Sequence, residues 1–299
     1  MPVSSPGEKF RAESSWSSTK GDGEVETRPA VIGSEKTLVE VLQRLKPALA
    51  QLKPDEQSVE RFLQTVRRVA QRNPDVLQCT VASMENAVKD SAVLGLDPTG
   101  LMGMGYIIPF RNKRGDMEAT FIPGYHGLVD MIYRTKKVAG LNFKLVHRDD
   151  AWDYIEGSEP RIEHAPRFTG TIEYANREEC IGGYVTWWDV IDGHPVAKRQ
   201  CWMWLAEIER VRCSSKQTRN GESSGTWRDE WQAMALKTLI RRAIKTMALT
   251  PDVADKLDYA LANEDAKMGK PDPYIDVTPG DPTAPAEGRE KIGATQDAS

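Results

Sequence analysis

Residues 181–203 read Ile-Gly-Gly-Tyr-Val-Thr-Trp-Trp-Asp-Val-Ile-Asp-Gly-His-Pro-Val-Ala-Lys-Arg-Gln-Cys-Trp-Met. β-branched and aromatic residues are enriched in strands, and an Asp-Gly pair between two such runs is a strong signal for a hairpin turn. The stretch therefore predicts two antiparallel strands, at 181–190 and 195–203. We expect sheet packing for most of the tryptophans in and beside it, which are Trp187, Trp188, Trp202 and Trp204.

Further strands are predicted upstream of this hairpin. Apolar runs at 106–110 and 119–123 flank a polar loop, 111–116, whose composition is that of a hairpin turn. A short helix follows at about 127–137. Shorter strand-like runs lie between that helix and the long hairpin, at 142–146, 152–155 and 161–164.

Helical periodicity surrounds this strand-rich middle. Apolar residues recur every three or four positions in five segments, at 37–49, 55–71, 80–94, 205–213 and 226–247. We expect Pro47 to kink the first helix or to mark its start after a break. Helices, then strands, then helices indicate an α+β fold, in which an antiparallel sheet with hairpins is packed by N-terminal and C-terminal helices.

The two ends of the chain differ in composition from the body. Residues 1–34 combine Ser, Gly and charge without apolar periodicity, which predicts a disordered arm. Residues 35–250 form the predicted core, with 31 basic against 28 acidic residues, whereas 251–299 carry five basic against eleven acidic ones. We expect a further helix at 251–268 and an acidic, disordered tail at 269–299.

Several classes of protein are excluded by what the sequence lacks. No run of 18 apolar residues is present to span a membrane, and the N-terminus shows no secretory pattern, so we expect a cytoplasmic protein. Cysteines at 79, 180, 201 and 213 fit neither a disulfide framework nor zinc spacing, and reduced thiols are expected. P-loop, HExxH, GxSxG and kinase motifs are missing too, and no cofactor is indicated.

The closing helix, 226–247, carries the most informative charge pattern. Lys237, Arg241 and Lys245 recur every four residues on one face, with Arg242 beside them, and residues 231–250 contain no acidic side chain. An unpaired cationic stripe of this kind suits a polyanion such as a phosphate backbone. The alternative is an ordinary solvated face of a surface helix.

Cations on three further elements fit the same interpretation. Positive residues interleaved with aromatic ones are typical of grooves that follow a single nucleic-acid strand, although each cluster alone is more typical of ordinary surface. The polar loop 214–225 is expected to be mobile without a ligand. The cations are Arg111, Lys113 and Arg114 in the first hairpin, Arg134 and Lys137 at the end of the short helix, and Arg210 and Arg212 in 205–213.

An enzyme that cuts DNA is the competing interpretation. Asp149, Asp150 and Asp153 gather carboxylates as a metal-dependent nuclease does. They lie, however, at a hairpin border where Asp is common for turn reasons, and no lysine at a suitable spacing completes a nuclease site. The four histidines are scattered along the chain, and no metal site is predicted.

Taken together, the motifs resemble those of the RecT family of phage single-strand annealing proteins. The resemblance covers about residues 36–250, most of the predicted core. Its motifs are specific in combination and weak one by one. They are Leu94-Gly-Leu-Asp-Pro98, Tyr106-Ile-Ile-Pro-Phe110, Gly124-Tyr-His-Gly-Leu128 with Arg134, His164-Ala-Pro166, and Trp227 followed by Met234-Ala-Leu-Lys237, Arg241-Arg242 and Lys245.

The resemblance implies an ATP-independent recombination protein, not an enzyme. Such proteins bind single-stranded DNA in a narrow basic groove, assemble into rings or helical filaments, and anneal the strand to its complement. A partner 5′→3′ exonuclease and a bacterial host cell, with a phage or prophage gene, are implied as well. A non-catalytic scaffold that binds duplex DNA remains an alternative.

Fourteen residues are the expected contacts with DNA. Position 126 departs from the family, whose members often carry Arg or Lys there; a His126–phosphate contact would strengthen as the imidazole gains a proton. The acidic tail could compete with DNA, dock a partner or only aid solubility. The fourteen are Tyr106, Arg111, Lys113, Arg114, Tyr125, His126, Arg134, Lys137, Arg210, Arg212, Lys237, Arg241, Arg242 and Lys245.

Overall fold

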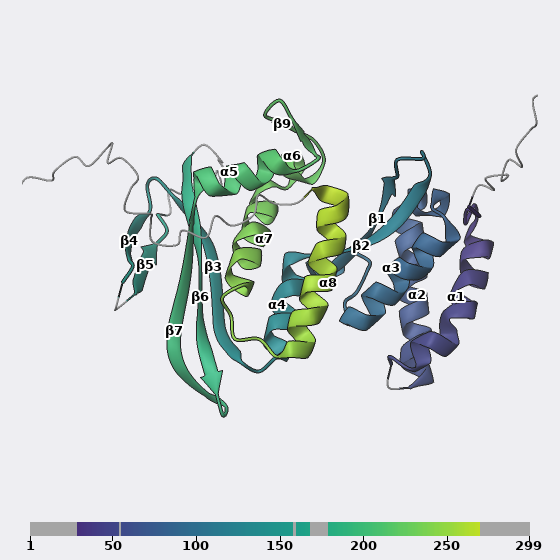
Figure 1. The fold of residues 1–299 in the computed structure, drawn as a ribbon, viewed down its shortest axis with the longest axis horizontal. Coiled ribbons are helices and arrows are strands. Elements are labelled where there is room, and N and C mark those ends of the chain that lie inside the picture. Colours follow the sequence, from purple (N-terminus) through teal and green to yellow (C-terminus); the bar gives the residue numbers. More distant parts are fainter. Residues whose placement is uncertain (1–28, 54, 158–159, 168–178, 270–299) are drawn as a thin grey trace, which may run out of the picture.

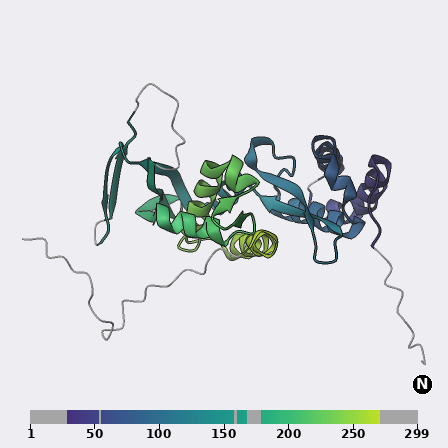
Figure 2. The same cartoon turned by 90° about the horizontal axis from the view of Figure 1, so that it is seen from above.

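The computed structural model of the chain describes residues 29–53, 55–157, 160–167 and 179–269. Within them the fold is α+β with antiparallel strands, which confirms the predicted class. The molecule is elongated: the first three helices lie at one end, and a small hairpin, β4–β5, lies at the other (Figures 1 and 2). The expected acidic tail lies outside the described residues, apart from Gly269.

Three amphipathic helices build the N-terminal end: α1 (Glu35–Ala50), α2 (Glu56–Arg72) and α3 (Val81–Leu94). Each begins at a polar N-cap whose side chain accepts a hydrogen bond from the amide three residues on; the caps are Ser34, Asp55 and Thr80. Helix α1 continues through Pro47, so of the two expectations for this proline, the helix start after a break is wrong.

The predicted disordered arm, 1–34, is wrong for its last residues. Ile32 is only 2% exposed and belongs to the main core, and Val31 pairs with Thr80 in an isolated β-bridge. An apolar Val-Ile pair next to a cap residue was the signal for this short ordered segment. Residues 1–28 lie outside the described part of the chain.

A hairpin and a short helix lead from these helices to the sheet. Strands β1 (Gly105–Arg111) and β2 (Met117–Pro123) pair antiparallel, with Ile108 opposite Thr120. The adjoining 3₁₀ turns are η1 (Pro74–Gln78) and η2 (Leu101–Gly103), and the short helix is α4 (Tyr125–Arg134).

A three-stranded sheet forms the other half of the molecule, in the order β3–β6–β7. Its strands are β3 (Val138–His147), β6 (Cys180–Ile191) and β7 (His194–Trp204), and the two predicted strands of the long hairpin are β6 and β7. The hairpin of β4 (Ala151–Ile155) and β5 (Arg161–Ala165) packs on one face of this sheet, where Trp152 stacks on Trp202 with ring centroids 4.9 Å apart. Trp188 and Trp204 are 41% and 52% exposed, so sheet packing holds for only part of the set.

The closing helices follow the sheet along the chain. These are α5 (Leu205–Ser214), the one-turn α6 (Thr226–Asp229), α7 (Trp231–Ile244) and α8 (Pro251–Met268). Helices α5 and α7 pack on the sheet, whereas α6 packs on α7 and α8 packs on α4 and β2. The predicted single helix 226–247 is thus interrupted at Glu230, whose backbone is not helical. The polar loop before it contains a small hairpin, β8 (Thr218–Arg219) with β9 (Glu222–Ser223).

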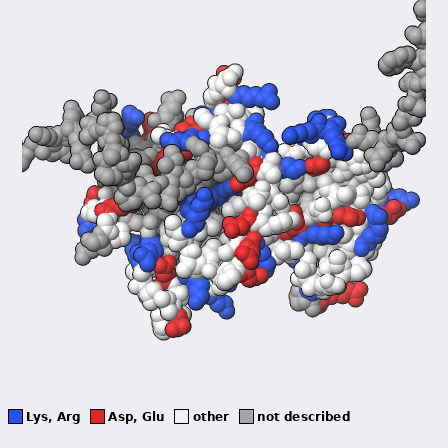
Figure 3. All heavy atoms as spheres, in the orientation of Figure 1, with Lys and Arg blue, Asp and Glu red and all other residues white. Residues whose placement is uncertain are grey.

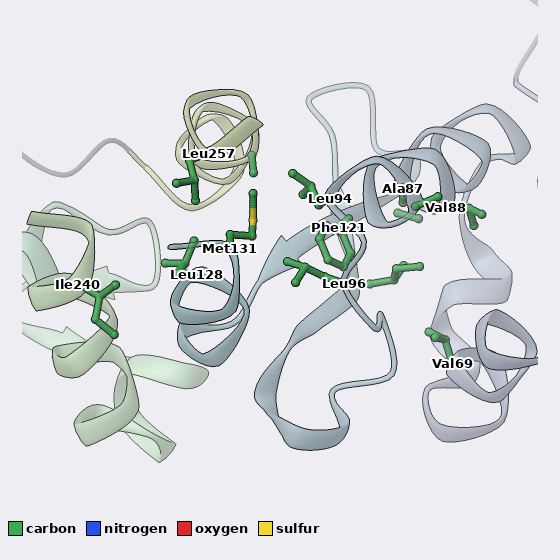
Figure 4. Packing of buried hydrophobic residues seen from close by; sticks show 14 of the residues in the cluster. Val69, Ala87, Val88, Leu94, Leu96, Phe121, Leu128, Met131, Ile240 and Leu257 are labelled. Atoms are coloured by element: carbon green, nitrogen blue, oxygen red, sulfur yellow. The ribbon is translucent and has the colours of Figure 1, made fainter. Parts of the chain in front are cut away.

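One apolar cluster runs through both halves of the molecule. It joins α1–α3, the β1–β2 hairpin, α4, the sheet and α7, and it includes Leu257 and Ala260 of α8. Figure 4 shows Leu257 beside Leu128 and Met131 of α4. Helix α8 is therefore part of the core, although its sequence pattern is weak.

The four cysteines are free thiols. Burial raises the pKa of Cys79, Cys180 and Cys201 to about 11, which disfavours their reactive thiolate form. No helix in the described ranges is long and apolar enough to cross a bilayer.

Candidate nucleic-acid interface

The predicted cationic stripe on the closing helix is mostly paired, which corrects the sequence interpretation. Lys237 is buried, and its Nζ donates to the Pro123 carbonyl at 2.7 Å and to Glu264 Oε1 at 2.6 Å. Arg241 donates to Asp265 Oδ1 at 2.5 Å. The acids that neutralise these cations come from α8, more than 20 residues further along the chain, so a window on the closing helix could not reveal them.

Arg242 and Lys245 complete the stripe in different ways. Arg242 donates to Glu207 Oε1 on α5 at 3.0 Å, so it is also engaged. Lys245 is exposed at the C-terminal end of α7, and within the described part of the chain its ammonium has no ion-pair partner. Of the four predicted cations, Lys245 is the exposed one, Arg241 and Arg242 are partly buried, and Lys237 is buried.

Two further predicted contacts, Arg212 and Arg134, hold parts of the fold together, although Arg134 also remains exposed. Arg212 is 4% exposed and holds the β8–β9 hairpin through hydrogen bonds to the Gly221 carbonyl and Ser223 Oγ, while its Nε donates to Glu209. This anchoring argues against the predicted mobility of loop 214–225. Arg134 donates to the Leu94 and Gly95 carbonyls at 2.6 and 2.9 Å, so it closes the C-terminal end of α3.

The remaining predicted cations lie at the surface. Arg111 donates to Gly115 across the β1–β2 turn, where Lys113 and Arg114 are also exposed. Lys and Arg side chains gather at this hairpin tip in Figure 3. Lys137 is exposed at the start of β3, and Arg210 is exposed on α5.

An exposed apolar and aromatic patch lies around turn η2, at the end of β1 that is opposite the hairpin tip. Met102 is 83% exposed and has a left-handed backbone (φ 58°) that non-glycine residues adopt only at a cost. Leu101 and Tyr106 are 45% and 41% exposed, and His126 is exposed too. We call these four residues the η2 patch; the sequence analysis found Tyr106 and His126 but missed Leu101 and Met102.

Glycines hold the η2 patch in place by close backbone packing. A Cβ on Gly124 would lie 1.9 Å from the Gly103 carbonyl oxygen, so only glycine lets the turn rest on the start of α4. Gly103 in turn faces the His126 ring, and Gly100 faces the Tyr106 ring. Glycines clustered around apolar residues, as in Gly100-Leu-Met-Gly103, were the available signal for this patch.

Tyr125 packs against the His126 ring of the η2 patch. It is half-buried, with its ring 4.1 Å from His126 and 6.0 Å from Phe143, centroid to centroid. Burial, and then the neighbouring Tyr106, raises the pKa of Tyr125. Tyr125 is thus a packing residue that orients His126, and Tyr106 and His126 present the accessible rings.

Asp150, the central residue of the nuclease alternative, is engaged in the fold, whereas Asp149 and Asp153 are exposed. Asp150 accepts from the backbone amides of His147 and Arg167 and from the His164 ring. Burial raises the pKa of Asp150, but these hydrogen bonds outweigh it and leave the pKa below its ordinary value. Within the described residues, no three His, Cys, Asp or Glu side chains gather as a metal site requires.

Comparison with known proteins identifies the family of this chain. The family model "RecT family" matches residues 60–271, from α2 to just beyond α8. The chain belongs to the RecT family. It is 28% identical to Protein RecT of Escherichia coli K12 over 216 residues, which cover 70% of this chain and 74% of that protein.

A second match is less similar to this chain. The uncharacterized protein YqaK of Bacillus subtilis is 22% identical over 189 residues, or 63% of this chain and 56% of that protein. Membership of the RecT family gives this protein a role in DNA recombination and strand annealing, and the family's proteins are annealing proteins, not catalysts. The family assignment from the sequence motifs is confirmed.

Proposed function

We propose that this RecT-family protein binds single-stranded DNA without sequence preference and anneals it to a complementary strand without ATP. The observation that carries the proposal is the family match, which spans every element from α2 to α8. No bond is made or broken in this mechanism. Lysine and arginine neutralise phosphates and release counterions, and base pairing alone decides which two strands stay together.

The surface cations are the proposed phosphate contacts. They are Arg111, Lys113 and Arg114 at the β1–β2 tip, Lys137, Arg210 and Lys245. For the buried or paired residues Lys237, Arg241, Arg242, Arg212 and Arg134, the hydrogen bonds described above support a role in positioning α7, the β8–β9 hairpin and α3 instead.

The η2 patch is the proposed contact with bases. Stacking of a base on an aromatic ring contributes about 1–3 kcal/mol and tolerates any base, which suits a protein that does not read sequence. Gly124, the N-cap of α4, supplies no capping side chain, and the η2 turn packs against this end of the helix instead. Met102, Tyr106 and His126 would then hold bases, while the surface cations meet the phosphates.

Assembly is part of the proposal. A single chain makes few phosphate contacts, and side-by-side copies on one strand multiply them. We propose a homo-oligomer, a ring or helical filament, that acts in the cytoplasm of a bacterial host from a phage or prophage gene. A 5′→3′ exonuclease would supply the exposed strand.

The test is the annealing of two complementary labelled oligonucleotides without ATP, at two salt concentrations, with strand lengths checked on a denaturing gel. We expect faster, salt-sensitive annealing with intact strands. Shortened strands in the presence of Mg²⁺ would favour a nuclease, and a preference for duplex over single-stranded competitor would favour a scaffold. Absence of annealing would overturn the proposal.

A further inference from the structure

Helix α2 presents a row of arginine and glutamine side chains that the proposed interface does not include. Its members recur every three or four positions, so they share one face of the helix. All of them are exposed, whereas the apolar face of α2 is buried in the core. We call this feature the α2 row; it consists of Gln57, Arg61, Gln64, Arg68 and Arg72.

The acids of its own helix do not balance the charge of the α2 row. The two carboxylates within α2 are Glu56 and Glu60, which lie outside the row, and Glu60 forms an ion pair with Lys46 of α1. Asp55 caps the start of α2. Hydrogen bonds from Ser58, and to a lesser degree the charge of Arg61, lower the pKa of Asp55. The row therefore carries three positive charges with one carboxylate near its first turn.

Within the described residues, the guanidinium groups of the α2 row use few of their donors. Arg61 makes two long contacts of 3.4 Å, to the Gln57 carbonyl and to Ser58 Oγ. Arg72 donates to the Thr99 carbonyl at 3.3 Å. Arg68 makes no hydrogen bond or ion pair with any described residue. Because a guanidinium has five N–H donors, the row can donate to several oxygens outside the chain.

One end of the α2 row adjoins the η2 patch. Thr99 accepts from Arg72, and it pairs with Tyr106 of the patch in an isolated β-bridge. Asp97, two residues before Thr99, accepts from the Thr99 amide, and it forms no ion pair with Arg72 in the described chain. From Arg72 the row runs back to Arg61, a distance of about 16 Å at 1.5 Å per residue. This length equals the rise of roughly five base pairs.

The chemistry of the α2 row suits phosphates and not unpaired bases. Arginine and glutamine side chains are common donors to phosphate oxygens, and a guanidinium binds a phosphate through two parallel hydrogen bonds. Surfaces that hold a single strand add aromatic rings on which bases stack. The aromatic residue of α2 is Phe62, which is buried. A strand whose bases are already paired needs no such ring, so the row fits the backbone of a duplex.

We propose that the α2 row binds the phosphate backbone of duplex DNA, as a second DNA contact beside the η2 patch. The inference rests on the proposed function, because pairing of a strand held at the η2 patch produces a duplex whose second backbone must lie near that patch. The α2 row is then engaged after the complementary strand has paired. It stabilises the annealed product and contributes little to binding of the single strand.

The test compares the full-length parent with the Arg61→Gln, Arg68→Gln double variant. One labelled oligonucleotide is used as a single strand and as a preformed duplex, and fluorescence anisotropy at several salt concentrations gives the log–log slope for each. We expect the double variant to lose about two from the duplex slope, at roughly 0.9 per phosphate contact, and to keep the parental slope on the single strand. Lys36→Gln with Arg44→Gln removes two exposed charges from α1; this matched control should change neither slope.

A gain of charge tests the same surface in the other direction. Gln64→Lys adds a cation in the middle of the row and should raise the affinity for the duplex. Thermal circular dichroism checks that each variant is folded. An unchanged duplex slope in the double variant, an equal loss on both forms of DNA, or a parent that does not bind the preformed duplex would overturn the proposal. A parent that binds this duplex through the row without annealing strands would overturn the proposed function alone.

Discussion

At the scale of single residues, Lys237 and Glu264 form a buried ion pair that holds α8 on α7. The Lys237 ammonium has the Pro123 carbonyl as its second partner. Burial lowers the pKa of Lys237, and the Glu264 carboxylate opposes that effect. A buried charge that loses its partner keeps its desolvation cost, so the two residues are far more sensitive to single than to joint replacement.

Lys237→Met leaves Glu264 with the Arg241 guanidinium, 3.5 Å away, as its remaining ion-pair partner among the described residues, so it should destabilise the protein by up to about 3–5 kcal/mol, the usual cost of breaking a buried ion pair. Lys237→Met combined with Glu264→Leu should recover most of that loss. Urea unfolding followed by circular dichroism measures both. Equal stability of the single and double variants would show that the pair is not coupled.

Replacement of Tyr106 tests whether an aromatic ring of the η2 patch stacks on a base. Its ring is 41% exposed and rests on Gly100. Tyr106→Ala should weaken binding of a short single-stranded oligonucleotide by about 1–3 kcal/mol if one base stacks there, and Tyr106→Phe should bind like the parent. Fluorescence anisotropy at fixed salt is the measurement; unchanged affinity for Tyr106→Ala would remove the η2 patch from the proposed interface.

Asp150 predicts a specific acid sensitivity. Its pKa lies below the ordinary 3.8 in the fold, because hydrogen bonds from His147, Arg167 and His164 outweigh burial. A carboxyl whose pKa is lower in the folded than in the unfolded state stabilises the protein at every pH above its unfolded-state pKa. That contribution is lost as the pH falls below 3.8 and through the folded-state pKa. The difference in unfolding free energy between the parent and Asp150→Asn should thus shrink in that window. A difference that is constant with pH would contradict this.

At the scale of elements, α8 contributes more to the stability of the fold than its sequence pattern indicates. It contributes Leu257 and Ala260 to the core, pairs Glu264 and Asp265 with α7, and donates from Lys267 to Glu118 on β2 at 2.5 Å. A chain ending at residue 250, the predicted end of the core, should fail to fold cooperatively. A chain ending at Gly269 should keep its cooperative melting, and thermal circular dichroism compares the two. Equal melting of both would refute the structural role of α8.

Most elements could be predicted because their signals are local. Ser34, Asp55 and Thr80 cap helices that then bury an apolar stripe, and Asp192-Gly193 joins two strands of strong β-forming residues. The signals were weak or hidden where a distant element decides the outcome. Ile32 is ordered by α3, and α8 is a helix with little hydrophobic patterning that is fixed by ion pairs.

The residues of the candidate site also divide into those that local sequence predicts and those that depend on distant partners. Exposure of Lys113 and Lys245 follows from their places at a turn and near a helix end, which the sequence indicates; Lys137 was predicted at a helix end and lies just before strand β3 instead. The state of Lys237 and Arg212 depends on partners brought by the tertiary fold, and charge spacing along one helix carries no information about them. Helical periodicity therefore located the cations correctly but could not separate structural from accessible ones.

At the scale of the whole molecule, the accessible cations predict the salt dependence of DNA binding. Lys113→Ala, Lys137→Ala and Lys245→Ala together should lower the log–log salt slope by about two, at roughly 0.7 per phosphate contact on a single strand. Lys36→Ala, an exposed residue on α1, is the matched control and should change little. A salt slope that is unchanged in the triple variant, with the protein still folded, would show that phosphates bind elsewhere.

The continuous core has a consequence for the spacing of a bound DNA strand. Arg134 of α4 fastens the end of α3, and one apolar cluster joins the N-terminal helices to the sheet, so the two halves share one continuous core. Under the proposed function, the β1–β2 tip and the start of β3 then stand at a fixed separation. The distance between phosphates held by the two contacts would then follow from that separation. A row of copies along one strand would repeat the same distance, so the bound strand would have a uniform spacing that a complementary strand can match.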